Sequence, residues 1–298
     1  MQDVTKDRDK YIGGSDVPII MGLSPFKTRW QLLQEKAGIV ESTFAGNEYT
    51  EYGNVMEPKI RDYINKEYNM HFVEDKDISG FMRYHYDGLD EKKRSVLEIK
   101  TTSQIHDDIS GYKKYLVQLL TGVKIADMGF GILAVYERPE DFDEEFDANR
   151  LTLFDVRLAD YVSLLTDIAN ACQRFWDDLT ALKENPFMTE EDLQPFPVIA
   201  EAQIVCQLEE QLAVYKDIER QCKAAKEQLK NAMEAYNVKT WTTPNGTKIT
   251  LVPDGEDKTV REFDLKRFEK ENSALMQPYM VDKVKKGGHG YVKITLPK

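Results

Sequence analysis

The sequence predicts an α/β protein with a mixed central β-sheet flanked by helices, followed by a C-terminal extension of helix and β structure. Two strand-like segments, residues 81–86 and 96–100, lie on either side of a charged turn, and two more apolar segments follow at 128–136 and 151–156. Segments with helical spacing of apolar residues precede, separate and follow these strands. This alternation is typical of a single sheet covered by helices.

Length and proline content predict how the chain is divided. At 298 residues the chain is long enough for about two domains of roughly 150 residues each. Three prolines fall within residues 186–200, and we interpret that segment as a linker. We therefore expect one domain over residues 1–185 and an extension over residues 201–298.

The first elements are short helices. Two glycines precede Ser15 and Asp16, either of which could cap a short apolar helix that ends near Gly22. The free N–H groups of such a helix could instead hold a phosphate. Thr28 is placed to cap an amphipathic helix over residues 30–37.

The next helix is predicted over residues 52–68, with Glu57 in its early part and Pro58 tolerated in its first turn. We also predict a short strand at 71–73 and a helix at 111–124. The spacing of apolar residues predicts a last helix of this domain over residues 159–183.

The extension begins with a long amphipathic helix over residues 201–236. Its apolar stripe could pack within the chain or mediate self-association, and the spacing favours neither. A Pro-Asn-Gly turn at 244–246 predicts a hairpin between residues 238–243 and 247–252. A short helix at 265–272 and a final strand at 291–296 complete the prediction.

Charge and composition exclude several classes of protein. The net charge of −12 argues against a protein that coats nucleic acid with its whole surface. Most of this negative charge lies in residues 126–200, which carry 5 Lys/Arg against 17 Asp/Glu. No apolar run approaches the roughly 20 residues of a membrane span, and the polar start does not resemble a signal peptide, so we expect a cytoplasmic protein. The three cysteines contain no C-x-x-C pair, which disfavours zinc and iron–sulfur sites.

The candidate site lies in the stretch YDGLDEKKRSVLEIK, residues 86–100. The first strand is expected to deliver Asp87 into a turn at Gly88. Side chains alternate along a strand, so Glu98 and Lys100 point to one face of the second strand. Pairing of the two strands would bring Asp87 and Glu98 together beside Lys100, a pattern suited to a hard divalent cation. The alternative is a hairpin with ordinary surface charges.

These segments together resemble the YqaJ-type viral recombinase family, which includes lambda exonuclease and belongs to the PD-(D/E)XK nuclease superfamily. The resemblance covers roughly residues 8–156. Its motifs occur in family order: Arg8 ahead of IGGSD, GLSPFKT, GNVMEP with Glu57, Asp87-Gly88, Glu98-Ile-Lys100, and YLVQ ending at Gln118. It implies a PD-(D/E)XK, restriction-endonuclease-like core.

The resemblance also implies roles for these residues. Asp87, Glu98 and the carbonyl of Ile99 would bind Mg²⁺, or Mn²⁺ in its place, and Lys100 would act on the nucleophilic water. Glu57 would complete the acidic site and Gln118 would brace it. Arg8 and Ser15, which are seven residues apart, would receive a DNA 5′ phosphate.

The implied function is a Mg²⁺-dependent 5′ to 3′ exonuclease on double-stranded DNA ends. Such an enzyme would serve phage-type recombination in the bacterial host cell and supply 3′ single strands to an annealing protein. A ring-shaped trimer is the implied assembly. The alternative is a DNA-end binding and partner-recruiting module with little or no hydrolysis. Tyr86 stands where the superfamily motif has proline, and residues 201–298 have no counterpart in lambda exonuclease.

Overall fold

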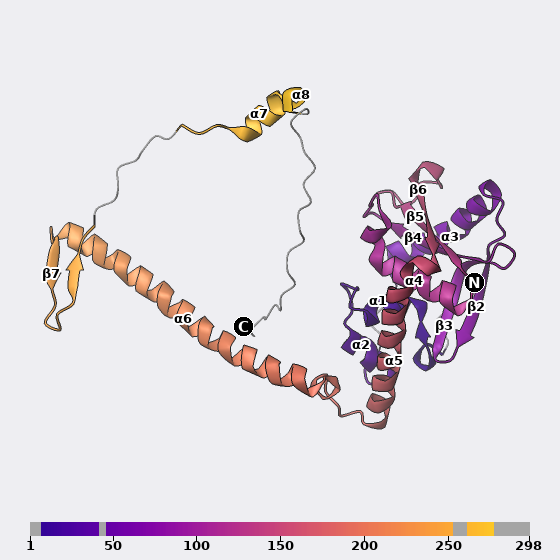
Figure 1. Ribbon diagram of the computed structural model, residues 1–298, viewed down its shortest axis with the longest axis horizontal. Helices are drawn as coiled ribbons and strands as arrows, with labels where there is room; N and C mark the ends of the chain where they lie inside the picture. Colours follow the sequence, from indigo (N-terminus) through magenta and orange to yellow (C-terminus); the bar gives the residue numbers. More distant parts are fainter. Residues whose placement is uncertain (1–6, 42–45, 253–260, 277–298) are drawn as a thin grey trace. The chain divides into compact units, whose positions relative to one another are not determined.

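The computed structural model describes residues 7–41, 46–252 and 261–276 (Figure 1). The chain divides into two compact units, Met1–Leu193 and Gln194–Lys298, and each is described by itself. The first unit contains the sheet and every candidate site residue.

The first unit is built around a six-stranded mixed sheet, as the sequence predicts. β3 and β4 form an antiparallel hairpin, β4 and β5 are parallel, β5 and β6 are antiparallel, and β1 joins β3 in parallel. The strand order is β1-β3-β4-β5-β6, with β2 also paired to β3. The strands are β1 (Ile12–Gly13), β2 (Val73–Ser79), β3 (Met82–Asp90), β4 (Ser95–Thr102), β5 (Phe130–Glu137) and β6 (Leu151–Arg157).

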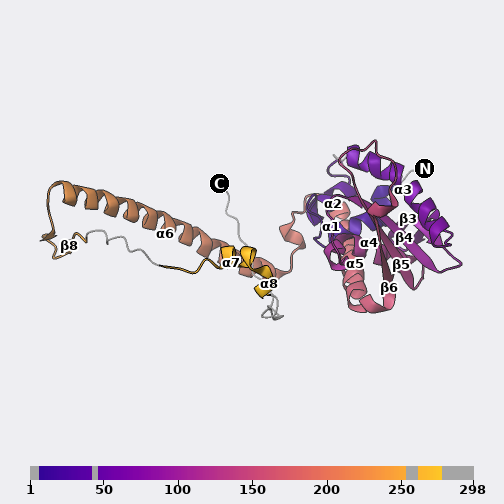
Figure 2. The same cartoon turned by 90° about the horizontal axis from the view of Figure 1, so that it is seen from above.

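Helices cover both faces of this sheet, with α3 on one side and α4 and α5 on the other (Figure 2). Short 3-10 turns join several of them. The α-helices are α1 (Val17–Ile20), α2 (Arg29–Lys36), α3 (Glu48–Glu67), α4 (Lys113–Ile125) and α5 (Val162–Glu184), and the 3-10 turns are η1 (Arg8–Lys10), η2 (Gly14–Asp16), η3 (Ile109–Tyr112), η4 (Ala148–Arg150), η5 (Leu158–Tyr161) and η6 (Glu191–Leu193).

The sheet separates two hydrophobic cores. Leu97 and Ile99 of β4 pack with α3 in the smaller core, whereas Val96 faces α4 and α5 in the larger one. Burial on both faces explains why β4 has apolar residues, Val96, Leu97 and Ile99, that face opposite sides of the sheet. Glu98 therefore interrupts a strand that is otherwise suited to the interior.

The prediction of a turn at Gly88 is wrong. β3 continues through Gly88, which pairs with Leu97, and the turn lies at residues 91–94. A Cβ at Gly88 would lie 2.7 Å from the Cβ of Phe72. The glycine is therefore needed for the close approach of Phe72 and not for a turn.

The strand predicted at residues 71–73 is also misplaced. The side chain of Asn65 binds both backbone groups of Phe72, at 2.7 and 2.9 Å, and β2 instead starts at Val73. All seven residues of β2 are exposed, so it has no apolar alternation that a sequence could reveal. Its pairing with β3 holds it in place.

α3 begins four residues earlier than predicted, because Asn47 caps it by accepting the N–H of Thr50 at 3.0 Å. Pro58 consequently lies inside the helix and not in its first turn. Proline has no N–H to donate, so the carbonyl of Asn54 loses its helical partner there. Glu57 is therefore a mid-helix residue.

The two N-terminal capping predictions differ in outcome. Thr28 caps α2 as expected, accepting the N–H of Gln31 at 3.2 Å while the Gln31 side chain accepts that of Thr28 at 2.8 Å. Of the two residues that could cap the first helix, Ser15 and Asp16, it is Asp16 that stands at the N-cap position of α1, but the helix has no side-chain cap bond, and the Asp16 carboxylate is instead buried in an ion pair with Lys36. Asp16 is therefore a buried anion that pairs with Lys36, and not a helix cap.

The second unit contains α6 (Phe196–Ala235), the hairpin β7 (Thr240–Thr242) and β8 (Lys248–Thr250), and two short helices, α7 (Leu265–Glu271) and α8 (Ser273–Met276). The predicted hairpin is confirmed, with Gly246 at φ 86° in its turn. α6 starts inside the segment that we interpret as a linker. Met233 is the one buried residue of α6. The strand expected at residues 291–296 lies outside the described residues.

None of the helices in the described part of the chain is both long and apolar enough to cross a membrane.

Candidate functional site

The β3–β4 hairpin brings Asp87 and Glu98 together. The ladder pairs Gly88 with Leu97, and at the next position the carboxylate of Asp87 accepts the backbone N–H of Ile99 at 2.7 Å. The Asp87 side chain therefore takes the place of a backbone acceptor where the strands separate. This fixes the carboxylate beside β4, as the hairpin prediction required.

Glu98 is fully buried and receives three hydrogen bonds. Its Oε1 accepts Lys100 Nζ and Gln118 Nε2, each at 2.5 Å, and its Oε2 accepts the hydroxyl of Tyr84. The contact with Lys100 confirms that the two side chains share one face of β4. Gln118 comes from α4, and its side-chain amide reaches the carboxylate across the gap between the helix and β4.

Sequence reasoning missed Tyr84. Its ring is completely buried between η2 and α4, where a Cβ on Gly14 or Gly122 would lie 2.3 or 2.5 Å from a ring carbon. The two glycines make room for the ring, and the ring carries the hydroxyl to Glu98. Only the glycine within the helical pattern of α4 hints at this close approach in the sequence.

Arg61 is the second residue that sequence reasoning missed. It is 8% exposed, and its guanidinium donates to Glu57 Oε1 at 3.2 Å, to the Asp87 carbonyl at 2.5 Å and to Glu74 Oε1 at 2.5 Å. It follows Glu57 by one helical turn, a spacing that predicts a salt bridge. Through Arg61, α3 is tied to β3 and β2, and Glu57 is held next to Asp87.

Burial raises the pKa values of the carboxylic acids at this point. Burial and the neighbouring Asp87 raise the pKa of Glu57 to about 7. Burial likewise raises the pKa of Glu98 to about 7, against the opposing effect of Lys100. Burial lowers the pKa of Lys100, but the carboxylates of Glu98 and Asp87 outweigh it and raise the pKa above its ordinary value. Such carboxylates are stabilised in their ionised form by an added cation.

The donor chemistry fits a hard divalent ion. Asp87, Glu98 and Glu57 offer carboxylate oxygens, the ligand type that Mg²⁺ takes together with substrate phosphate. Within the described ranges, no three His, Cys, Asp or Glu side chains are gathered closely enough to form a cage for a metal. Lys100 and Arg61 instead neutralise the carboxylates. The site thus supplies charge and oxygen donors, while the resemblance alone assigns the Ile99 carbonyl as a ligand.

Arg8 and Ser15 lie on η1 and η2, and both are exposed. A guanidinium nitrogen of Arg8 lies 3.5 Å from Asp16 Oδ1. Gly14, the neighbour of Ser15, packs against the ring of Tyr84, which in turn reaches Glu98. The segment is therefore linked to the acidic site through one buried side chain.

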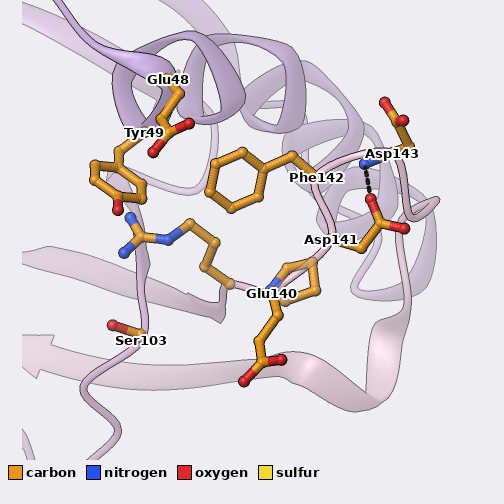
Figure 3. Close-up of a pocket in the computed structure, with 9 residues that line it drawn as sticks. Glu48, Tyr49, Ser103, Glu140, Asp141, Phe142 and Asp143 are labelled. Carbon is orange, nitrogen blue, oxygen red and sulfur yellow. Dashed lines mark hydrogen bonds between the residues drawn. The ribbon is translucent and has the colours of Figure 1, made fainter.

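A cavity of about 490 Å³ lies beyond the ends of β4 and β5 and contains none of the predicted site residues. Figure 3 shows Tyr49 and Phe142 in its wall. The guanidinium of Arg138 lies 4.1 Å from the ring centroid of Tyr49. Four carboxylates also line the cavity: Glu48, Glu140, Asp141 and Asp143. This balance of charge is unsuited to a DNA phosphate.

Comparison with known proteins confirms the resemblance. Residues 4–128 match the model of the YqaJ-like viral recombinase domain. A Bacillus subtilis (strain 168) protein, the uncharacterized protein YqaJ, is 26% identical over 185 residues, which cover 58% of this chain and 54% of that protein. The chain thus spans about half the length of the curated relative it matches.

Two solved structures are similar over most of their own length. An alkaline exonuclease from Laribacter hongkongensis, LHK-Exo, aligns with a TM-score of 0.47 at 19% identity, covering 59% of this chain and 91% of the other. A phage-related exonuclease from Haemophilus somnus 129PT aligns with a TM-score of 0.44 at 14% identity, covering 57% and 95%.

Proposed function

We propose that the chain is a metal-dependent exonuclease that degrades double-stranded DNA from its ends in phage-type homologous recombination. The observation that carries this proposal is the convergence of Asp87, Glu98 and Lys100 at the point where β3 and β4 separate, with Glu57 beside Asp87. The match of residues 4–128 to the YqaJ-like viral recombinase domain agrees with it.

The protein groups have separate tasks in this proposal. Asp87, Glu98 and the Ile99 carbonyl would hold Mg²⁺ or Mn²⁺, with Glu57 completing the acidic site. When bound, the metal would neutralise the charge that develops on the phosphate and make its water more acidic. Lys100, whose side chain is 26% exposed, can reach a water or a phosphate oxygen from the solvent side. Gln118 and Tyr84 hold Glu98 in position.

Polarity follows from the other end of the site. Arg8 can form charge-assisted hydrogen bonds to a terminal 5′ phosphate, and Ser15 can add a hydroxyl donor. An enzyme that anchors this group would digest 5′ to 3′ and leave a 3′ single strand for an annealing protein. Sequence readout is not needed, since phosphate contacts position DNA without reading its bases.

Assembly is part of the same proposal. A ring-shaped trimer in the bacterial cytoplasm would allow processive digestion despite the net charge of −12, because only the channel must be basic. Light scattering of the full chain tests this directly. A monomer at working concentration would remove the ring from the proposal.

The nuclease assignment is tested with a linear duplex that carries 5′ phosphates, in Mg²⁺. Lys100→Ala should lower the rate of nucleotide release by about 10² to 10⁴-fold, the usual contribution of a positioned acid–base group. Glu98→Ala removes a proposed metal ligand and should lower the rate at least as much. The matched controls are variants of two exposed residues, Glu140→Ala and Lys124→Ala, which should digest DNA at the wild-type rate.

The same assay separates the two candidate functions. Phosphorothioate linkages placed in one strand at a time should block digestion only when they protect the 5′ end, and closed circular DNA should be inert. A wild-type protein that retains duplex ends with Mg²⁺ or Mn²⁺ and releases no nucleotides would instead be an end-binding module. Unchanged digestion by Glu98→Ala would remove the proposed site.

A further inference from the structure

Lys36 is a buried lysine that the proposed reaction does not use. It ends α2, and its side chain is 3% exposed. Nζ donates to the carbonyls of Arg8 at 2.8 Å and Tyr11 at 2.7 Å, and pairs with Asp16 Oδ2 at 2.8 Å. Three acceptors require three N–H donors, which only the charged ammonium has. The geometry therefore places a positive charge beneath the segment that carries Arg8.

Asp16 is the matching anion, with a side chain that is 1% exposed. Its Oδ2 accepts the N–H of Gly13 at 2.8 Å as well as Lys36, and its Oδ1 lies 3.5 Å from the guanidinium of Arg8. One carboxylate thus contacts the backbone before Ser15 and the side chain of Arg8. The long, half-exposed contact with Arg8 is the weaker of its two ion pairs, because Lys36 lies closer and is shielded from water.

The charges of this cluster decide how strongly Arg8 attracts a phosphate. With Lys36 in place the negative charge of Asp16 is neutralised, and the charge of Arg8 remains available to an incoming anion. Without Lys36 the carboxylate would hold Arg8 for itself and repel a phosphate, since like charges at a shared cation compete. Lys36 also fixes the backbone of η1 through the Arg8 carbonyl.

We propose that Lys36 and Asp16 are positioning residues that set the preference of the Arg8–Ser15 segment for a 5′-phosphorylated DNA end. The inference rests on the proposed function, because it takes that segment as the phosphate receptor. It adds a specificity switch: the buried lysine neutralises the one carboxylate that would otherwise compete with the substrate.

Binding is the first test and does not depend on hydrolysis. Fluorescence anisotropy with excess chelator measures the full chain on two labelled duplexes that differ only in a 5′ phosphate or 5′ hydroxyl. Lys36→Met should reduce the preference for the phosphate by about tenfold, the equivalent of one charge-assisted contact. Lys36→Arg should retain most of the preference, because it restores the charge.

The double variant separates charge from structure. Lys36→Met combined with Asp16→Asn removes both partners, so no carboxylate remains to compete for Arg8, and the preference should return toward the wild-type value. A purely structural role would leave the double variant as defective as the single one. The matched control is Lys27→Met, which breaks the 2.6 Å ion pair between Lys27, just before α2, and Glu35 in the last turn of that helix, and should leave the preference unchanged.

Folding is checked by circular dichroism for each variant. If Lys36→Met does not fold, Asp16→Asn decides the question, because removal of the competing carboxylate should hold or increase the phosphate preference. A preference unchanged in folded Lys36→Met, a double variant without recovery, or a decrease in Asp16→Asn would overturn the inference.

The two proposals fail in different ways. A wild-type chain that prefers 5′ phosphates without digesting DNA would refute the nuclease and leave the role of Lys36 intact. Digestion that depends on Glu98 but ignores the 5′ phosphate would leave the nuclease intact and refute both the phosphate receptor at Arg8 and Ser15 and the role of Lys36.

Discussion

The first unit contains two carboxylate–lysine pairs with a buried carboxylate, and they differ in how much of the lysine side chain is exposed to solvent. Glu98 and Lys100 are two residues apart on β4, and the lysine side chain is 26% exposed. Asp16 and Lys36 join η2 to α2, and the lysine side chain is 3% exposed. Both carboxylates are almost completely buried.

This difference agrees with the two roles that we propose, a reactive one for Lys100 and a positioning one for Lys36. A lysine that reaches solvent can meet a substrate, whereas a sealed lysine acts only through the groups that it holds. The remaining interactions agree: Glu98 has two neutral donors besides Lys100, but Asp16 depends on Lys36 and one backbone N–H for its buried contacts. We expect the first pair to govern rate and the second to govern stability and end preference.

The largest expected difference is in folding stability. Lys36→Met should lower the free energy of unfolding by about 3–5 kcal/mol, because it leaves a buried carboxylate unpaired. Lys100→Met should cost about 1 kcal/mol, since Glu98 keeps two donors and can remain protonated near neutral pH. Denaturant unfolding followed by circular dichroism measures both.

The controls for this comparison are the arginine variants of each lysine, which retain the charge. Equal losses for the two methionine variants would contradict the contrast between the pairs. In that case burial of the carboxylate, and not the closure of the lysine, would decide stability.

A smaller effect should appear in the pH dependence of stability. The pKa of Glu57 is raised from 4.5 to about 7, so the native state holds its proton more tightly than the unfolded chain does. The contribution of protonated Glu57 to the free energy of unfolding is therefore full at low pH and is lost as the pH rises from about 4.5 to about 7. Glu57→Gln removes that loss. Its melting temperature should exceed that of the wild type by several degrees at pH 8 and much less at pH 5.

This measurement is made without divalent cations, with Glu140→Gln as an exposed control. The same difference in melting temperature at both pH values would show that Glu57 does not titrate in this range. The acidic end of the site would then differ less from an ordinary surface than its burial indicates.

Much of the sheet could be predicted because its central strands are buried on both faces. β5 forms a long apolar run, β4 has Val96, Leu97 and Ile99 around Glu98, and each strand is observed within two residues of its expected ends. β2 could not be predicted, because its residues are exposed and its position depends on backbone pairing with β3. A strand of this kind leaves no pattern in its own sequence.

The site was predictable where its residues are close in the chain. Glu98 and Lys100 follow from strand alternation, and Asp87 from the hairpin. Tyr84 and Lys36 were missed because their partners are 14 and 20 residues away and depend on packing between separate elements. The buried role of Asp16 was missed for the same reason, since Ser-Asp before an apolar run reads equally well as a helix cap.

The smallest expected effect concerns the start of α2, the end opposite Lys36. Thr28 and Gln31 exchange two hydrogen bonds there, and Thr28 is exposed. Thr28→Ala should cost about 1 kcal/mol and lower the melting temperature by about 2–4 °C, while Thr28→Ser should cost less because it keeps the acceptor. The preference for a 5′ phosphate should stay unchanged in both, because Lys36 is held at the other end by Arg8, Tyr11 and Asp16. Calorimetry and the anisotropy assay check the two expectations. A loss of end preference in Thr28→Ala would show that fraying of α2 reaches Lys36, and the sealed pair would then be less independent of its helix than its contacts indicate.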